Sequence, residues 1–223
     1  MSNTELIRIR SDEQYVMPGL NQVCFITGGQ TLSLVLGSCI STVFIGRNDR
    51  FVMAANHIVI ARQKKESIVA KRSAQEQIDD ILRLYDEEFR IPNDRLVCLH
   101  LVGAGKKLAG DSFTIDAENV EVTSALLAER EIPVLFNDTR SHYFATFSLG
   151  SGSLSVFIED KITNVHISYI IDLERLFNAD WKKIGALPAS ALKPNSLAFE
   201  EMVEEGVIVF ITGEKNRRYE GLV

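Results

Sequence analysis

The sequence has few of the features that mark exported or membrane-spanning proteins. Its 223 residues include only three cysteines and no Cys-x-x-Cys pair, so a disulfide framework is not expected. The polar residues 1–14 contain no apolar signal-peptide core, and every apolar run is too short or too interrupted to cross a bilayer. These absences predict reduced thiols and a cytoplasmic protein without membrane insertion.

Basic residues are outnumbered by acidic ones, with 24 Lys and Arg against 30 Asp and Glu, for a formal net charge of −6. An acidic chain binds nucleic acid poorly, so we expect no nucleic-acid partner. A nucleotide cofactor is not expected either. The glycine-rich stretch 103–110 has His100 where a Walker A motif needs its first glycine, and Leu108 where a dinucleotide fingerprint needs its third.

Metal ligands are equally sparse. Cys98 and His100 form a Cys-x-His pair that a regular strand would place on one face, but two ligands do not make a zinc site. His142 and His166 are isolated along the chain. We therefore expect no metal, and we expect Cys24 and Cys98 to be small, inert core residues.

Apolar periodicity predicts an α+β domain of mixed strands with two main helices, at residues 66–89 and 118–130. Residues 33–45 predict two strands broken near Gly37, or a strand entering a helix. A turn at 46–50 then returns as a strand at 51–61. The inward side of the second helix is assigned to Val122, Ala125, Leu126 and Leu127. Further strands are expected at 23–26, 96–102, 133–136, 142–149, 154–158, 165–171 and 207–211, with short helices at 172–177 and 196–205.

Cys39 differs from the other cysteines because Gly37 and Ser38 before it allow a tight bend that presents the sulfur outward. Such a bend also leaves backbone N–H groups free to hold an oxyanion. His57 lies across the expected hairpin, and a cysteine hydrolase needs an imidazole near its thiol to take the proton. On these grounds alone, a packed cysteine and an exposed histidine remain the commoner alternative.

The wording and order of several motifs between residues 15 and 158 resemble the chemoreceptor glutamine deamidase family, CheD. The most specific part is Leu-Gly-Ser-Cys-Ile at 36–40, followed by Ala-Asn-His at 55–57. Weaker matches follow: Val-Gly-Ala-Gly at 102–105, Ile-Asp-Ala-Glu-Asn at 115–119, and Asp138 before a closing hairpin.

The resemblance implies a fold of mixed sheets packed like a sandwich with helices outside. It also implies hydrolysis of glutamine side chains on methyl-accepting chemoreceptors. Cys39 would be the nucleophile and His57 the general base and acid. The oxyanion region assigned to Gly37 and Ser38 follows instead from the bend before Cys39. The family's hydroxyl that orients the histidine would fall on Ser33, with Thr31 as the other candidate. The family is also associated with a CheC-type chemotaxis phosphatase.

Several positions depart from the family pattern. Met-Ala-Ala at 53–55 replaces Gly-Gly-Met, Ala61 replaces a proline, and Thr-Arg-Ser at 139–141 replaces Gly-Gly. Residues 159–223 have no recognisable counterpart, so we expect a CheD-like domain at 1–158 with a C-terminal extension packed on it. Two other functions stay open: a catalytically inactive module that binds receptors or the phosphatase, and an unrelated small-molecule hydrolase.

Overall fold

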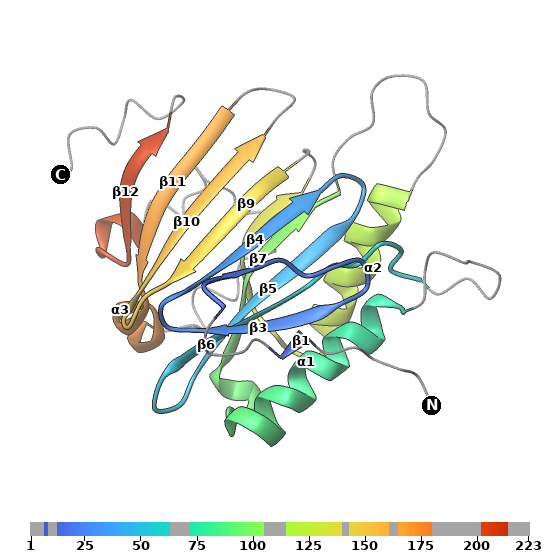
Figure 1. The fold of residues 1–223 in the computed structure, drawn as a ribbon, viewed down its shortest axis with the longest axis horizontal. Helices are drawn as coiled ribbons and strands as arrows, with labels where there is room; N and C mark the ends of the chain where they lie inside the picture. The colour runs from blue at the N-terminus through green and yellow to red at the C-terminus, as the bar shows by residue number, and fades with distance from the viewer. Residues whose placement is uncertain are drawn as a thin grey trace.

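The computed structural model describes residues 7–8, 13–62, 72–104, 115–139, 143–160, 165–179 and 202–213. It has an α+β fold with two mixed β-sheets and few helices (Figure 1). Asp138 and His166 are described as backbone only. Some predicted features lie outside the described residues: the glycine-rich stretch from 105 onward, His142, and residues 66–71 and 196–201 of two predicted helices.

The first sheet, sheet A, contains six strands in the order β1-β3-β6-β5-β7-β8. Its outer pairs β1–β3 and β7–β8 are parallel, and the three inner pairs are antiparallel. β5 and β6 form the predicted hairpin, but β6 ends one residue before His57. The strands span Ile7–Arg8 (β1), Val23–Thr27 (β3), Ile40–Arg47 (β5), Phe51–Asn56 (β6), Leu96–Gly103 (β7) and Val134–Thr139 (β8).

The second sheet, sheet B, has the order β12-β11-β10-β9-β4-β2. All of its pairs are antiparallel except β2–β4. The chain passes from β4 in this sheet to β5 in sheet A through residues 37–39. The strands span Tyr15–Val16 (β2), Gln30–Leu36 (β4), Tyr143–Leu149 (β9), Ser153–Asp160 (β10), Val165–Asp172 (β11) and Ile208–Gly213 (β12).

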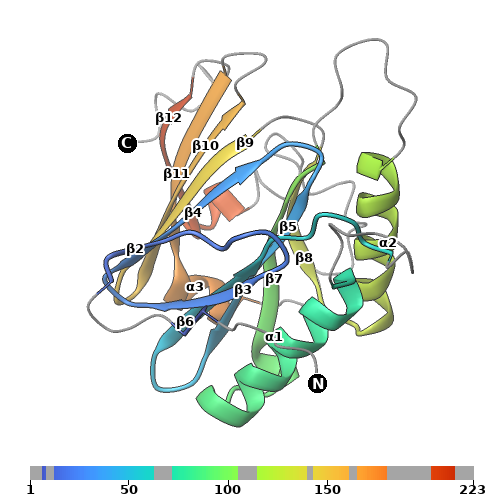
Figure 2. The same ribbon diagram turned by 45° about the vertical axis from the view of Figure 1, so that its right-hand side comes forward.

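The two sheets pack face to face, and helices α1 (Ala74–Phe89) and α2 (Ile115–Glu129) cover the other side of sheet A (Figure 2). Alternation along β5 shows how one strand serves two cores, because successive side chains point to opposite faces. Val43 and Ile45 join the inter-sheet core, whereas Ile40 and Phe44 join the core beneath the helices. None of the helices within the described ranges is long and apolar enough to cross a membrane.

Both main helices differ from their predicted limits. α1 begins at Ala74 because Ser73 caps it: the Ser73 hydroxyl accepts from the Glu76 N–H, and the Glu76 carboxylate accepts from the Ser73 N–H. α2 begins three residues earlier than predicted. Its buried residues are Asn119, Thr123 and Leu127, spaced four apart, and Ala125 is exposed, so the predicted inward side was partly wrong.

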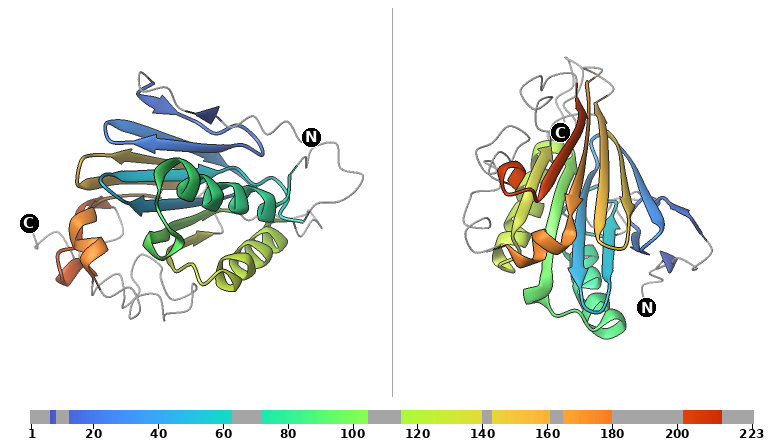
Figure 3. Two further views of the ribbon diagram at one scale, coloured as in Figure 1. Left: turned by 90° about the horizontal axis from the view of Figure 1, so that it is seen from below. Right: turned by 90° about the vertical axis from the view of Figure 1, so that its left-hand side faces the viewer.

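Beyond residue 160 the chain extends sheet B. β11 pairs with β10 along its whole length, and β12 adds the next strand. The short helix α3 (Leu173–Asn178), capped by Asp172, lies on the side of the molecule away from α1 and α2 (Figure 3). The division at 158 and 159 stays a prediction, and the described strands of the second part continue the sheet of the first.

The predicted arrangement of Cys98 and His100 on one face is wrong. The register between β5 and β7 shifts between Val43 and Phe44, which leaves one extra residue on β7 between Cys98 and His100. Cys98 packs beneath the helices, while the His100 ring stacks on Phe136 in the inter-sheet core. There His100 Nε2 lies 2.6 Å from the Tyr169 hydroxyl of β11. Cys24 and Cys98 are fully buried, as predicted.

Candidate functional site

Cys39 lies where the chain crosses from sheet B to sheet A. Gly37 and Ser38 form the bend before it, as the sequence predicts, and Ile40 begins β5. The Cys39 carbonyl accepts a hydrogen bond from the Ala104 N–H at 2.7 Å, which continues the β5–β7 ladder by one residue. The side chain is partly exposed and packs against the inter-sheet core. The thiol therefore sits at the rim of the space between the sheets.

His57 follows the last residue of β6 and is held on both sides by the loop before β3. Its N–H donates to the Gln22 carbonyl at 3.1 Å, and its carbonyl accepts from the Asn21 N–H at 2.8 Å. The ring Nδ1 lies 3.3 Å from the Pro18 carbonyl oxygen. Because that oxygen can only accept, Nδ1 carries the proton, which leaves the lone pair on Nε2. The unprotonated nitrogen of the ring is therefore Nε2.

The strand register places Cys39 and His57 on the same face of sheet A. Ile40 and Ile58 exchange hydrogen bonds at 2.9 and 2.8 Å and pack beneath the helices. Their neighbours Cys39 and His57 consequently point the other way, toward the inter-sheet side. They are diagonal neighbours across the ladder, a relation in which Cβ atoms lie about 7 Å apart or slightly less, within reach of an imidazole.

Ser41 joins this face, and sequence reasoning did not identify it. The register that pairs Val43 with Ala55 and Ile40 with Ile58 puts Ser41 directly opposite His57. Its hydroxyl is fully buried and, within the described part of the chain, has no hydrogen-bond partner. The sequence does contain one signal for Ser41, its i+2 spacing from Cys39. Residues two apart share a face only in a strand, so this spacing is informative only once the strand is known. We call Cys39, Ser41 and His57 the Cys39 cluster.

Ser33, the hydroxyl that the family resemblance suggests, is not brought to the Cys39 cluster. Along β4, Leu32, Leu34 and Leu36 face the inter-sheet core. Ser33 alternates with them and faces outward, on the same side as the exposed Val35. Thr31, the other candidate, shares that outer side and lies 2.9 Å from the Ser148 hydroxyl, oxygen to oxygen.

The turn after β7 packs closely against the Cys39 main chain. Gly103 has a φ of 105°, and a Cβ atom added there would lie 2.3 Å from the Cys39 carbonyl oxygen. Ala104, with a φ of 51°, donates the hydrogen bond to that same oxygen. Only glycine adopts the Gly103 backbone at little cost and leaves room for the neighbouring strand. The Val-Gly-Ala part of the motif at 102–105 therefore supports the segment that carries the thiol.

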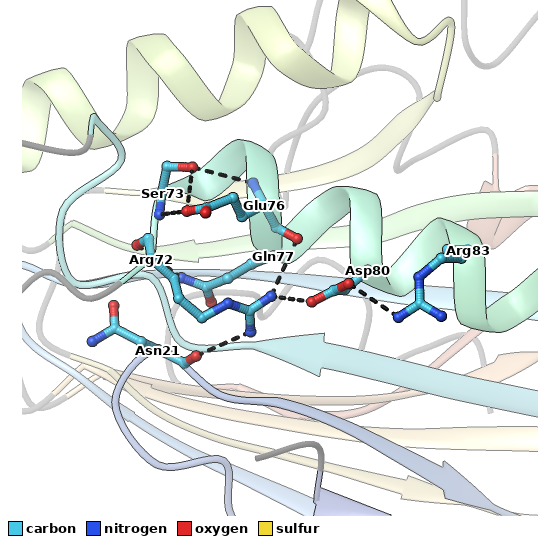
Figure 4. Close-up of polar contacts among 7 residues, drawn as sticks. All are labelled: Asn21, Arg72, Ser73, Glu76, Gln77, Asp80 and Arg83. Atoms are coloured by element: carbon cyan, nitrogen blue, oxygen red, sulfur yellow. Dashed lines mark hydrogen bonds and ion pairs between the residues drawn. The ribbon is translucent and has the colours of Figure 1, made fainter. Parts of the chain in front are cut away.

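The loop that holds His57 is fastened to the start of α1 through Arg72 (Figure 4). The Arg72 guanidinium donates to the Asn21 carbonyl at 3.4 Å and forms an ion pair with Asp80. Arg83 donates to the second Asp80 oxygen at 3.1 Å. Asn21 in turn has a left-handed backbone and donates its N–H to the His57 carbonyl. Arg72 thus holds Asn21, and Asn21 holds the His57 main chain.

Burial sets the protonation states of the cluster. It raises the pKa of the Cys39 thiol above its ordinary 9.0, and a hydrogen bond from the residue's own backbone N–H partly offsets this rise. It also lowers the pKa of His57 below 6.5, against the opposing effect of the Pro18 carbonyl. Both side chains are therefore neutral near neutral pH. In these protonation states the thiol still carries its proton and the imidazole is free to accept one.

The lowered pKa of His57 predicts a loss of stability in acid. The unfolded chain binds a proton on this residue more readily than the folded chain, so the free energy of unfolding falls as pH drops below about 6.5. Replacing His57 with glutamine removes that proton uptake. Urea unfolding of wild type and His57→Gln between about pH 7.5 and 5 should show the steeper decline in wild type. Parallel curves for the two proteins would contradict the prediction.

Comparison with known families finds no family model that matches the chain, and comparison with curated proteins finds no matching relative. The described residues contain no group of three or more His, Cys, Asp or Glu side chains placed to hold a metal ion.

Proposed function

We propose that this protein is a protein-glutamine deamidase of the CheD type, acting on glutamine side chains of methyl-accepting chemoreceptors in bacterial chemotaxis. One observation carries the proposal: Cys39 and His57 share a face at the rim of the inter-sheet space, and the Pro18 carbonyl leaves His57 Nε2 as the base. The motif resemblance supplies the substrate class. Receptor cytoplasmic helices as substrates agree with the expected cytoplasmic location.

The proposed reaction proceeds through a thioester. The Cys39 sulfur attacks the amide carbon while His57 Nε2 accepts the thiol proton. The tetrahedral intermediate collapses as the carbon–nitrogen bond breaks, and the imidazolium gives its proton to the departing ammonia. His57 then accepts a proton from water, whose oxygen attacks the thioester carbon. The carbon–sulfur bond breaks, the proton returns to sulfur, and glutamate is released. Gly37 and Ser38 remain the proposed oxyanion region, because the bend they form can leave backbone N–H groups free.

In this proposal Ser41 takes the place expected for Ser33. A buried hydroxyl opposite the imidazole is positioned to accept or donate a hydrogen bond when the His57 ring turns toward the sulfur. The outward-facing Ser33 has no such relation to the ring. Ser41 would therefore orient His57 during the reaction.

Paired substitutions distinguish the two hydroxyls. Ser41→Ala is expected to lower kcat about 10-fold to 100-fold, because it removes one hydrogen bond that matters only when the ring is aligned. Ser33→Ala should change kcat by less than about twofold, since Ser33 faces the outside of sheet B. Both are measured as initial rates of deamidation. A large loss for Ser33→Ala with none for Ser41→Ala would restore the family assignment.

The alternative is a catalytically inactive module that binds receptors or a CheC-type phosphatase. The observation that favours it is burial, which raises the pKa of the Cys39 thiol and therefore disfavours the reactive thiolate. Under this alternative, Cys39 and His57 are packing residues at the rim of the core.

Incubation with purified receptor cytoplasmic domains separates these functions. Each Gln→Glu conversion adds about one dalton, and peptide mass spectrometry locates it. The deamidase predicts conversion at defined glutamines, with ammonia released in equal amount. Binding of the receptor domain or the phosphatase without any conversion would support the inactive module.

A further inference from the structure

Asn119 of α2 joins the two chain segments that carry the Cys39 cluster. Its side-chain Nδ2 donates to the Ser38 carbonyl and to the Val59 carbonyl, each at 3.1 Å. Its Oδ1 accepts from the Ala61 N–H at 2.7 Å. Ser38 directly precedes Cys39, and Val59 is the second residue after His57. One buried side chain therefore contacts both the segment that carries Cys39 and the segment that carries His57.

The three partners determine how this amide is oriented. The Ser38 and Val59 carbonyls can only accept, and the Ala61 N–H can only donate, so Nδ2 faces the first two and Oδ1 the third. Both amide protons are used. Asn119 is fully buried and lies on the helix side of sheet A, across the sheet from the face that bears the thiol. Its hydrogen bonds to Ser38, Val59 and Ala61 all go to main-chain atoms.

We propose that Asn119 is a positioning residue that sets the distance between the Cys39 sulfur and the His57 ring. The inference rests on the proposed function, because it requires these two residues to react together. The Ile40–Ile58 pair fixes the same two segments from within the sheet, and Asn119 fixes them from α2. Without the amide, the carbonyl of Ser38 and that of Val59 are no longer held at one point. The side chains of Cys39 and His57, on the opposite face, are then no longer held at a fixed distance from each other.

The test compares Asn119→Ala with Thr123→Ala in the full chain. Thr123 is the next residue of the same buried stripe on α2, is equally buried, and has a hydroxyl without a partner within the described residues. Both substitutions leave a small cavity under the helix, but only Asn119→Ala removes the hydrogen bonds to the Ser38 and Val59 carbonyls. The readout is the rate at which iodoacetamide alkylates Cys39 as a function of pH, with the modified residue identified by mass spectrometry. His57→Ala defines the part of the profile that depends on the imidazole.

We expect Asn119→Ala to lose the imidazole-dependent part of the profile and match His57→Ala, while Thr123→Ala keeps the wild-type profile at a similar melting temperature. With receptor domains as substrate, Asn119→Ala should lower kcat about 100-fold and leave KM unchanged, because small displacements of reacting groups cost rate. Retention of the wild-type profile by Asn119→Ala, or its equal loss in Thr123→Ala, would overturn the inference.

Asn119→Asp decides the question if the alanine variant does not fold. The carboxyl keeps the volume and the acceptor for the Ala61 N–H. Its protonated form donates one hydrogen bond to the two carbonyls and its ionised form donates none. Its alkylation rate relative to wild type should therefore fall as pH rises, and a constant ratio near one would overturn the inference.

The same data separate the two proposals. Alkylation that depends on both His57 and Asn119, without deamidation of receptor domains, would refute the deamidase and leave the positioning role standing. Identical profiles for wild type and His57→Ala would refute both, since no reacting pair would exist.

Discussion

Replacing Cys39 with alanine is expected to abolish conversion of receptor glutamines, with a rate loss on the order of 10⁴-fold or more. The size follows from the loss of the nucleophile, because removal of a covalent catalyst leaves only the assistance of the remaining groups. The proposed mechanism passes through a thioester on this sulfur, and no other described cysteine can replace it. Deamidation rates measured by peptide mass spectrometry at saturating receptor domain give the comparison directly.

Cys24→Ala is the matched control. Complete burial raises the pKa of Cys24 to about 12, so its thiolate does not form near neutral pH. The substitution should lower stability through the lost packing and leave kcat within about threefold of wild type. Conversion by Cys39→Ala at the wild-type rate would show that the sulfur is not the nucleophile. Equal losses in both variants would point instead to a defect in folding.

Gly103→Ala is expected to destabilise the fold by about 3 kcal/mol or more and to reduce activity beyond the loss of folded protein. An alanine in this left-handed conformation costs about 1–2 kcal/mol, and forcing a methyl group against packed atoms costs about 1–3 kcal/mol more. The methyl would meet the Cys39 carbonyl oxygen, which belongs to main chain and cannot rotate away. Relief requires the Cys39 segment to move, and with it the sulfur.

Gly29→Ala separates the conformational cost from the clash. Gly29 has a φ of 88°, yet a Cβ atom there would meet nothing within 4 Å. We expect its free energy of unfolding to fall by only about 1 kcal/mol, with kcat unchanged. Denaturant titration and initial rates at full occupancy of the folded state measure both effects. Equal destabilisation of the two variants, with full activity in each, would mean that Gly103 does not support the thiol segment.

The parts of the fold that follow from local patterns were predicted well from the sequence. The break near Gly37, the β5–β6 hairpin and the strand predicted over residues 96–102 all depend on apolar periodicity and turn residues within a short window. The start of α1 was missed because the amphipathic pattern continues into residues that precede its cap. The capping pair Ser73 and Glu76 was present in the sequence and would have given the correct boundary.

Features that depend on contacts distant in sequence could not be predicted. The extra residue on β7 turns His100 into the inter-sheet core, and no local signal announces such a bulge. The partner of the His57 ring is a carbonyl 39 residues earlier in the chain. The relation of Ser41 to His57 requires the cross-strand register, which the sequence alone leaves unspecified. The Cys-His assignment itself came from the motif resemblance and stays a prediction.

The crossing of the chain from sheet B to sheet A at residues 37–39 has a mechanical consequence. Leu36 packs in the inter-sheet core and Ile40 packs in the core beneath the helices. The thiol therefore lies on a short segment that joins two separate hydrophobic cores. Close-packed interiors transmit small displacements rather than absorb them. We therefore expect substitutions in either core to shift the position of the Cys39 sulfur.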